Sequence, residues 1–349
     1  MGIQGGVVRK RQYFTPQSVE SCELLSGAEF FAQLSETFVR ILPRYFHGSV
    51  ALSLTGGLDT RMILAARRPE PGELPCYTFA GSYRDTLDLR IAARVAQACD
   101  QPHFVLRLDD NRFLADYPLH LAQSVYYTDG LGSVNTADVI ALNRRARTVA
   151  PVRITGKYGS QVLKSVSGFK ARPPIRELIR DDFRAYLDLA CKTMAAVQQR
   201  HSLSAMLSQE IPWWWNGFLA AESSQVTVGS PFLDNDLVDL LYRAPSRAMD
   251  AGSEFQLDFI RRRDPRLALI PTGGGRGGST NPVISATTRC LFWLLNAADK
   301  VYMRERLPFG LTHWFARVDR VLSAFGLDRL VMGFGTHRRY RVWFRRSAG

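Results

Sequence analysis

The sequence has few cysteines and lacks a long apolar run. Its five cysteines, at positions 22, 76, 99, 191 and 290, are odd in number and show no Cys-x-x-Cys spacing. A disulfide framework or a structural zinc site is therefore not expected. This cysteine usage fits a protein of the reducing cytoplasm. No stretch of about 18 apolar residues is present, so no membrane span is expected. The N-terminus also lacks the apolar segment of a secretory signal.

Acidic residues are also scarce. The chain has 32 Asp and Glu against 45 Lys and Arg, a formal net charge of +13, and such a field favours anionic partners. The densest basic segment is residues 337–346, where arginines alternate with aromatic residues in a pattern that can bind nucleic acid. We favour a C-terminal segment that docks its aromatic side chains onto the body, so a nucleic-acid partner is not expected.

The stretch from residue 49 to residue 66 has the pattern of a buried strand, a tight turn and a helix. Residues 49–54 form a short apolar run, as a parallel strand covered on both faces requires. Leu58, Met62 and Ala65 then recur at helical spacing. Between them lies Thr-Gly-Gly at residues 55–57, where glycine lets backbone N–H groups approach an anion.

This turn is predicted to bind a polyphosphate. The start of the following helix presents unpaired N–H donors and a partial positive charge, and Asp59 in its first turn can hold a magnesium ion. The turn lacks the Gly-Lys-Ser/Thr ending of a Walker loop and the spacing of a Gly-x-Gly-x-x-Gly loop.

Thr-Gly-Gly-Leu-Asp-Thr at residues 55–60 resembles the Ser-Gly-Gly-Leu-Asp-Ser pyrophosphate loop of the asparagine synthetase family, which belongs to the N-type ATP pyrophosphatases. A Gly-Gly turn can also be plain geometry. We favour the resemblance because two later segments agree with the family in the expected order.

Strands and helices alternate along the first half of the chain. After the first strand, further strands are predicted at 74–80, 103–108 and 152–154, and helices at 30–42, 85–99, 111–123 and 138–149. This alternation predicts an α/β fold with a doubly wound parallel sheet, and the resemblance implies the adenine nucleotide alpha hydrolase type. We expect a linker over 1–26, an ATP-pyrophosphatase core over 27–170 and a mostly helical part over 171–349.

The second matching segment follows the fourth predicted strand. Thr155 to Gln161 aligns with the family's Ser-Gly-x-Gly-x-Asp-Glu, and Thr155-Gly156 repeats the Thr-Gly that ends the first strand. Two such turns at strand ends suit a nucleotide that lies across two strands. Lys157, Ser160 and Gln161 stand where the family often has acids, and a lysine cannot coordinate magnesium. This departure counts against asparagine synthesis itself.

The third segment, Pro231-Phe232-Leu233-Asp234, matches the family's Pro-Phe-Leu-Asp. Further on, residues 270–278 form a glycine-rich loop, where the family has a late loop that faces the substrate. Arg276 is its one charged residue, and a disordered linker explains these glycines about as well.

The resemblance implies a ligase that activates a carboxylate as acyl-AMP, with ATP and Mg²⁺. Asp59 would hold the metal, and Asp59, Lys157 and Arg276 would be the catalytic residues. The nucleotide-binding residues would be Ser53, Leu54, Thr55, Gly56, Gly57, Asp59, Thr60, Ala80, Thr155 and Gly156.

The family's N-terminal glutaminase domain begins with a catalytic cysteine, whereas here Met1 is followed by Gly2 and the first cysteine is Cys22. We therefore expect a chain without that domain, which acts on a small-molecule carboxylate and takes its amine from ammonia or from a separate glutaminase. Two alternatives are an RNA-modifying ATP pyrophosphatase and a non-catalytic nucleotide-binding or partner protein.

Overall fold

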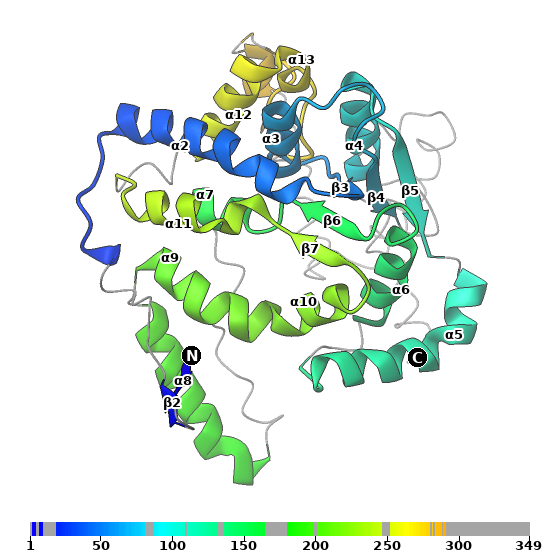
Figure 1. Ribbon diagram of the computed structural model, residues 1–349, viewed down its shortest axis with the longest axis vertical. Coiled ribbons are helices and arrows are strands. Elements are labelled where there is room, and N and C mark those ends of the chain that lie inside the picture. The colour runs from blue at the N-terminus through cyan, green and yellow to red at the C-terminus, as the bar shows by residue number, and fades with distance from the viewer. Residues whose placement is uncertain are drawn as a thin grey trace, which may run out of the picture.

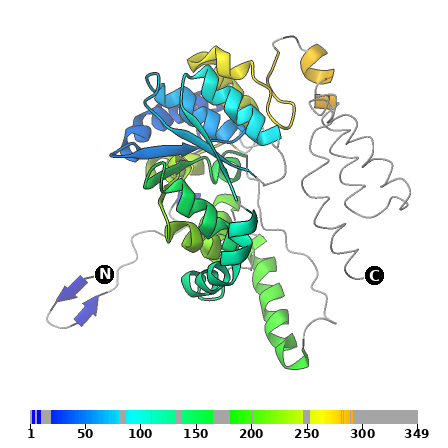
Figure 2. The ribbon, with the colours of Figure 1, turned by 90° about the vertical axis from the view of Figure 1, so that its right-hand side faces the viewer.

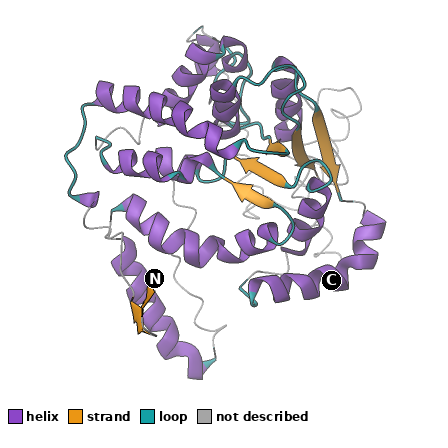
Figure 3. Ribbon diagram, in the orientation of Figure 1, coloured by secondary structure: helices purple, strands orange, loops and turns teal. Residues whose placement is uncertain are grey.

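The centre of the computed structural model is a five-stranded sheet in which every strand is parallel to its neighbours (Figures 1 and 3). The strand order is β5-β4-β3-β6-β7. Its strands are β3 (Val50–Ser53), β4 (Cys76–Ala80), β5 (His103–Arg107), β6 (Val152–Thr155) and β7 (Thr227–Gly229). A separate antiparallel hairpin joins β1 (Gly2–Gln4) to β2 (Val7–Arg9).

The structure describes residues 2–4, 7–9, 19–80, 87–108, 110–131, 136–164, 180–198, 201–245, 252–279, 281, 283–287 and 289–290. The predicted boundary between residues 170 and 171 and the basic segment 337–346 lie outside them. Within these residues, no helix combines the length and the apolar character that crossing a bilayer requires.

Helices cover both faces of the sheet (Figures 1 and 2). On one face lie α2 (Gly27–Ile41), α3 (Leu58–Arg67), α4 (Leu87–Ala98), α7 (Gly159–Lys164), α11 (Asn235–Tyr242), α12 (Gly252–Arg263) and α13 (Pro265–Ala268). On the other face lie α5 (Asp110–Thr128), α6 (Thr136–Ala146) and α10 (Asn216–Ser223). The remaining segments are η1 (Leu42–Tyr45), η3 (Asp181–Phe183), α8 (Arg184–Gln198), α9 (Ser202–Ala205), the π-helix η4 (Met206–Trp215) and η5 (Pro231–Leu233).

The central strand β3 shows why the sheet is buried on both sides. Successive side chains of a strand point to opposite faces. Leu52 belongs to the large core under α2 and α3, whereas Ala51 packs with Ala146 and Ala150 on the face that α6 covers. The apolar run at residues 49–54 is therefore an interior strand.

The α/β class, the parallel sheet and the four predicted strands are confirmed. The sequence did not predict the β1–β2 hairpin, which lies within the expected linker over 1–26. It also did not predict β7, which pairs in parallel with β6 and lies within the part predicted to be mostly helical. Three residues are too few to give a periodic signal, and β7 is an edge strand that is only partly buried.

The Pro-Phe-Leu-Asp segment connects the start of α11 to α2 and η1. The Asp234 carboxylate accepts from the backbone N–H of Asp236 at 3.0 Å and so caps α11. It also accepts from Arg44 Nη1 at 3.0 Å and from the Tyr45 hydroxyl at 3.2 Å. Phe232 is fully buried, with its ring centroid 5.1 Å from that of Phe38. In this structure the motif therefore ties the helical part to the sheet domain.

Replacing Asp234 by alanine should lower the free energy of unfolding by about 2 kcal/mol, because the helix loses its cap and the half-buried Tyr45 hydroxyl loses its acceptor. Thermal and urea unfolding measure the loss. Asp239→Ala is the matched control, because Asp239 is an exposed residue of the same helix. An equal change in both variants would contradict the capping role.

Candidate functional site

The Thr55-Gly56-Gly57 turn leaves the end of β3 and leads directly into α3. Gly57 occupies the position before the first helical residue, and no side chain caps this helix start. The N–H of Gly57 makes only a long contact of 3.4 Å to Thr55 Oγ1, whereas the N–H of Gly56 donates to the Asp88 carboxylate at 2.8 Å. The turn therefore presents a weakly engaged donor at a helix N-terminus, which is the arrangement that binds anions.

The second Thr-Gly turn lies beside the first. β3 and β6 pair in parallel with Ser53 opposite Thr155, so both turns leave the same edge of the sheet. From β3 the chain winds outward to β4 and β5 on one side and to β6 and β7 on the other. In parallel sheets, ligands bind beyond the carboxyl ends of the strands where the winding reverses. The pairing of β3 with β6 thus brings the two predicted turns together at that point.

Asp59 is held against the second turn by close packing. A Cβ atom added at Gly159 would come within 2.6 Å of Asp59 Cγ, and one added at Gly156 within 2.9 Å of the Thr60 backbone nitrogen. These distances are shorter than real Cβ contacts allow, so only glycine lets the start of α3 approach the start of α7 this closely.

Three polar side chains surround the Asp59 carboxylate. Gln256 Nε2 donates to Oδ1 at 2.6 Å, the Ser160 hydroxyl donates to Oδ2 at 3.1 Å, and Lys164 Nζ lies 3.9 Å from Oδ1. Burial lowers the pKa of Lys164, and the Asp59 carboxylate partly opposes that shift. Asp59 is therefore engaged by donors and by a lysine from two other segments, α7 and α12.

This donor set does not fit a resident metal ion. Magnesium needs several oxygen ligands near octahedral geometry, but both Asp59 oxygens already accept hydrogen bonds and a cation lies beside them. Among the described residues, no group of three or more His, Cys, Asp or Glu side chains could hold a metal. The assignment of magnesium to Asp59 stays a prediction from the sequence.

Lys157, expected to be a catalytic residue, contacts a buried glutamate. Its Nζ lies 2.5 Å from one carboxylate oxygen of Glu222, while Arg153 Nη1 lies 2.9 Å from the other. Arg153 also donates to the Ser53 hydroxyl at 3.0 Å. Lys157 Nζ further lies 5.2 Å from the centroid of the Phe218 ring. Burial lowers the pKa of Lys157, and Glu222 opposes the shift. Lys157 therefore joins β6 to α10.

The glycine-rich loop at residues 270–278 has a hydrogen-bonded structure. The backbone of Arg276 donates to Thr272 Oγ1 at 3.0 Å, and its carbonyl accepts from the Thr272 N–H at 2.8 Å. Gly277 has φ +78°, and a Cβ there would come within 2.9 Å of the Ala268 carbonyl oxygen. The glycines thus serve a specific turn. Arg276 itself is exposed and pairs with Glu254 at 3.0 Å.

Arg61 connects the residues at the start of the glycine-rich loop to the Thr-Gly-Gly turn. Its side chain is fully buried and donates to the carbonyls of Gly56, Leu267 and Ile270. Among the described residues no carboxylate pairs with it, and burial lowers its pKa to about 10. At neutral pH the guanidinium is charged and lies directly behind the turn.

The other predicted residues line the edge of the sheet. Thr60 Oγ1 accepts from the Thr55 N–H at 3.2 Å. Leu54 has a fully buried side chain, and its carbonyl accepts from the Thr78 hydroxyl at 2.8 Å. Ala80 is buried at the end of β4, and residues 81–86 beyond it lie outside the described part of the chain. The side chains of Ser53 and Leu54 face the interior.

Sequence reasoning missed the residues that organise the site from a distance. Glu222 and Gln256 come from helices far along the chain, and neither lies in a recognisable motif. Two signals were present. Arg61 interrupts an apolar helical stretch, and Lys164 follows Ser160 by four residues on α7, a spacing that places both on one helix face.

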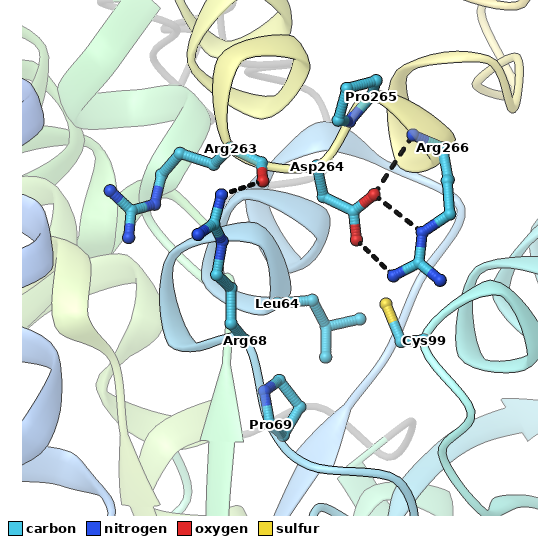
Figure 4. Close-up of a pocket in the computed structure, with 8 residues that line it drawn as sticks. All are labelled: Leu64, Arg68, Pro69, Cys99, Arg263, Asp264, Pro265 and Arg266. Atoms are coloured by element: carbon cyan, nitrogen blue, oxygen red, sulfur yellow. Dashed lines mark hydrogen bonds and ion pairs between the residues drawn. The ribbon is translucent and has the colours of Figure 1, made fainter.

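A concave region lies at the other end of α3, about 15 Å along the helix from the turn. Figure 4 shows this pocket of about 470 Å³, lined by Leu64, Arg68, Pro69, Cys99, Arg263, Asp264, Pro265 and Arg266. Arg266 pairs with Asp264 there at 3.0 Å. None of the predicted site residues lies in it.

Comparison of the sequence with protein-family models finds no match, and comparison with curated proteins finds none. The likeness to the asparagine synthetase family therefore rests on the three motif segments alone.

The packing of Asp59 predicts that Gly159→Ala destabilises the protein. Alanine in a helix is normally favoured over glycine by about 1 kcal/mol, but here its Cβ would displace Asp59. We expect a loss of about 1–3 kcal/mol in the free energy of unfolding. Gly27→Ala is the control, since Gly27 opens α2 with no atom within 4 Å of its added Cβ. A gain in both variants would show that Asp59 moves aside freely.

The buried cluster predicts that Glu222→Gln costs about 3–5 kcal/mol of stability, because Arg153 and Lys157 would share a buried space without a counter-charge. Chemical denaturation measures the loss. The double variant Glu222→Gln/Lys157→Met should recover part of it, since it removes one uncompensated cation. If the loss in the double variant equalled the sum of the losses in Glu222→Gln and in Lys157→Met alone, the coupling between the two residues would be contradicted.

Proposed function

We propose that this chain binds ATP across the two Thr-Gly turns and uses it to activate a carboxylate. The observation that carries the proposal is the parallel pairing of β3 with β6, which sets Thr55-Gly56 and Thr155-Gly156 side by side. Together with the resemblance of residues 55–60 to a pyrophosphate loop, this arrangement supports an N-type ATP-pyrophosphatase core of the adenine nucleotide alpha hydrolase type.

In the proposed reaction, a carboxylate oxygen of the substrate attacks the α-phosphorus of ATP. The bond to the bridging oxygen breaks, and pyrophosphate leaves with its electron pair. An amine nitrogen then attacks the acyl carbon of the acyl-AMP, AMP leaves, and the nitrogen loses a proton. The protein contributes mainly position and charge.

The residues of this chain divide into two groups in this proposal. The Gly57 N–H and the uncapped start of α3, with Thr55 and Thr60 beside them, receive the pyrophosphate. Thr155 and Gly156 flank the adenosine, with Ser53 and Ala80 at the adjacent strand ends. No step runs through magnesium, because the surroundings of Asp59 do not fit a resident metal.

The substrate class is a small-molecule carboxylate, and the amine comes from ammonia or from a separate glutaminase. Arg276 remains a candidate for the carboxylate contact, because its guanidinium is exposed and held only by a surface ion pair. Lys157 is a weaker candidate, since Glu222 already occupies its ammonium.

A second candidate function is nucleotide binding without catalysis. It is favoured by Ser160 and Gln161, which stand where the resembling family often has acids, and by the lysine beside Asp59. The two candidate functions differ in whether ATP is converted to AMP and pyrophosphate. ATP incubated with candidate carboxylates and ammonia should yield AMP and pyrophosphate, detected by mass spectrometry, if the chain is a ligase. Binding of ATP without any such product across a broad panel would favour the second candidate.

Gly57→Val tests the binding site itself. A Cβ at Gly57 would meet only Thr55 Oγ1, at an ordinary 3.5 Å, and the backbone is extended there. The fold should therefore tolerate valine, while its side chain blocks the approach of phosphate to the backbone. We expect calorimetry to show ATP affinity lowered by about 100-fold or more, with a melting temperature within a few degrees of the wild type.

The control for this prediction is Gly27→Val, the same change at the start of another helix. It should leave ATP affinity unchanged. Unaltered affinity in Gly57→Val, with the fold intact, would place the nucleotide elsewhere and remove the basis of the proposed function.

A further inference from the structure

Among the described residues, the cation that pairs with Asp59 is a lysine that no motif predicted. Lys164 and Ser160 are four residues apart on α7, so both face Asp59. Lys164 Nζ lies 3.9 Å from Asp59 Oδ1 and 3.3 Å from Ser160 Oγ, and the Ser160 hydroxyl donates to the other carboxylate oxygen at 3.1 Å. The ammonium is therefore aimed at the carboxylate next to the pyrophosphate turn.

Lys164 is also incompletely neutralised. Its ammonium lies at the outer limit of an ion pair, and the carboxylate beside it is shared with Gln256 and Ser160. The side chain is only 20% exposed, so water compensates it poorly. Beyond Asp59, Arg276 lowers the pKa of Lys164 and Glu254 raises it, so more distant charges of both signs act on the ammonium. In the described part of the chain no carboxylate lies closer to this ammonium than Asp59, and an anion entering here would supply a closer partner.

Lys157 differs in this respect. Its ammonium lies 2.5 Å from a Glu222 oxygen that is nearly inaccessible to solvent, on the side of the sheet that α10 covers. Freeing it for a ligand would leave Glu222 with a single cation. Of the two lysines in the 155–164 segment, Lys164 is the one available to a ligand at the turn.

We propose that Lys164 is the cation that neutralises a polyphosphate at this site, so that the chain binds pyrophosphate without a divalent metal ion. This inference rests on the proposed function, because it takes the Thr55-Gly56-Gly57 turn as the phosphate site. It follows from the misfit at Asp59, where a lysine and two hydrogen-bond donors occupy the surroundings that a metal would need. Lys164 supplies there the positive charge that a metal supplies elsewhere.

The test is calorimetric titration of the full chain with inorganic pyrophosphate at fixed ionic strength, once with a metal chelator and once with magnesium. The wild type should bind under both conditions. Lys164→Met should lower the affinity in chelator by about tenfold or more, the value of one charge-assisted hydrogen bond. Lys164→Arg, which keeps the charge, should restore most of it.

Lys192→Met is the matched control, since it removes the same charge from an exposed position on α8, and it should bind as the wild type does. Melting temperatures of all variants establish that each is folded. If Lys164→Met were unfolded, Lys164→Gln and Lys164→Arg would carry the comparison.

The outcomes separate the two proposals. Wild-type binding that requires magnesium, or equal affinity in Lys164→Met and wild type, would overturn the role of Lys164 and leave the phosphate site intact. Absence of pyrophosphate and ATP binding in both conditions would overturn the proposed function, and this inference with it.

Discussion

The parallel pairing of β3 with β6 is the contact on which the candidate site depends. It sets Ser53 opposite Thr155, so that the segments following both strands leave the sheet at one edge. Neither segment is unusual alone. Side by side, they place the start of α3 against the start of α7, and glycines at 156 and 159 permit contact distances that no other residue allows. A register shift of one residue would separate the two turns and turn the buried side chains outward.

The strong positive charge of the chain has consequences inside the molecule as well as on its surface. Three basic side chains on the site segments are largely removed from water, and they are stabilised in two different ways. Arg153 and Lys157 share the carboxylate of Glu222, whereas the two terminal nitrogens of Arg61 donate to three backbone carbonyls, with no carboxylate beside them in the described part of the chain. Arg61 thereby places a positive charge at the Gly56 carbonyl, while the Asp88 carboxylate accepts from the N–H of the same residue.

Arg61 also links segments that are remote in sequence. Its guanidinium bridges the Gly56 carbonyl and the carbonyls of Leu267 and Ile270, just before the glycine-rich loop. Gln256 makes a parallel link from α12 to Asp59. Through these two side chains the Thr55-Gly56-Gly57 turn and the start of α3 are joined to α12 and to the residues just before the glycine-rich loop.

By itself, the sequence determined what local patterns encode. The apolar run at 49–54 and the helical spacing after Gly57 placed β3 and α3, because strand and helix periodicity are properties of short segments. The two Thr-Gly turns followed for the same reason. The tertiary structure alone decided the partners of the charged side chains. Lys157 contacts Glu222, Lys164 lies beside Asp59, and β7 joins β6, because each of these contacts joins residues that no short-range spacing relates. Ion pairs and edge-strand pairing depend on which surfaces the completed fold brings together, and a local pattern does not contain that information.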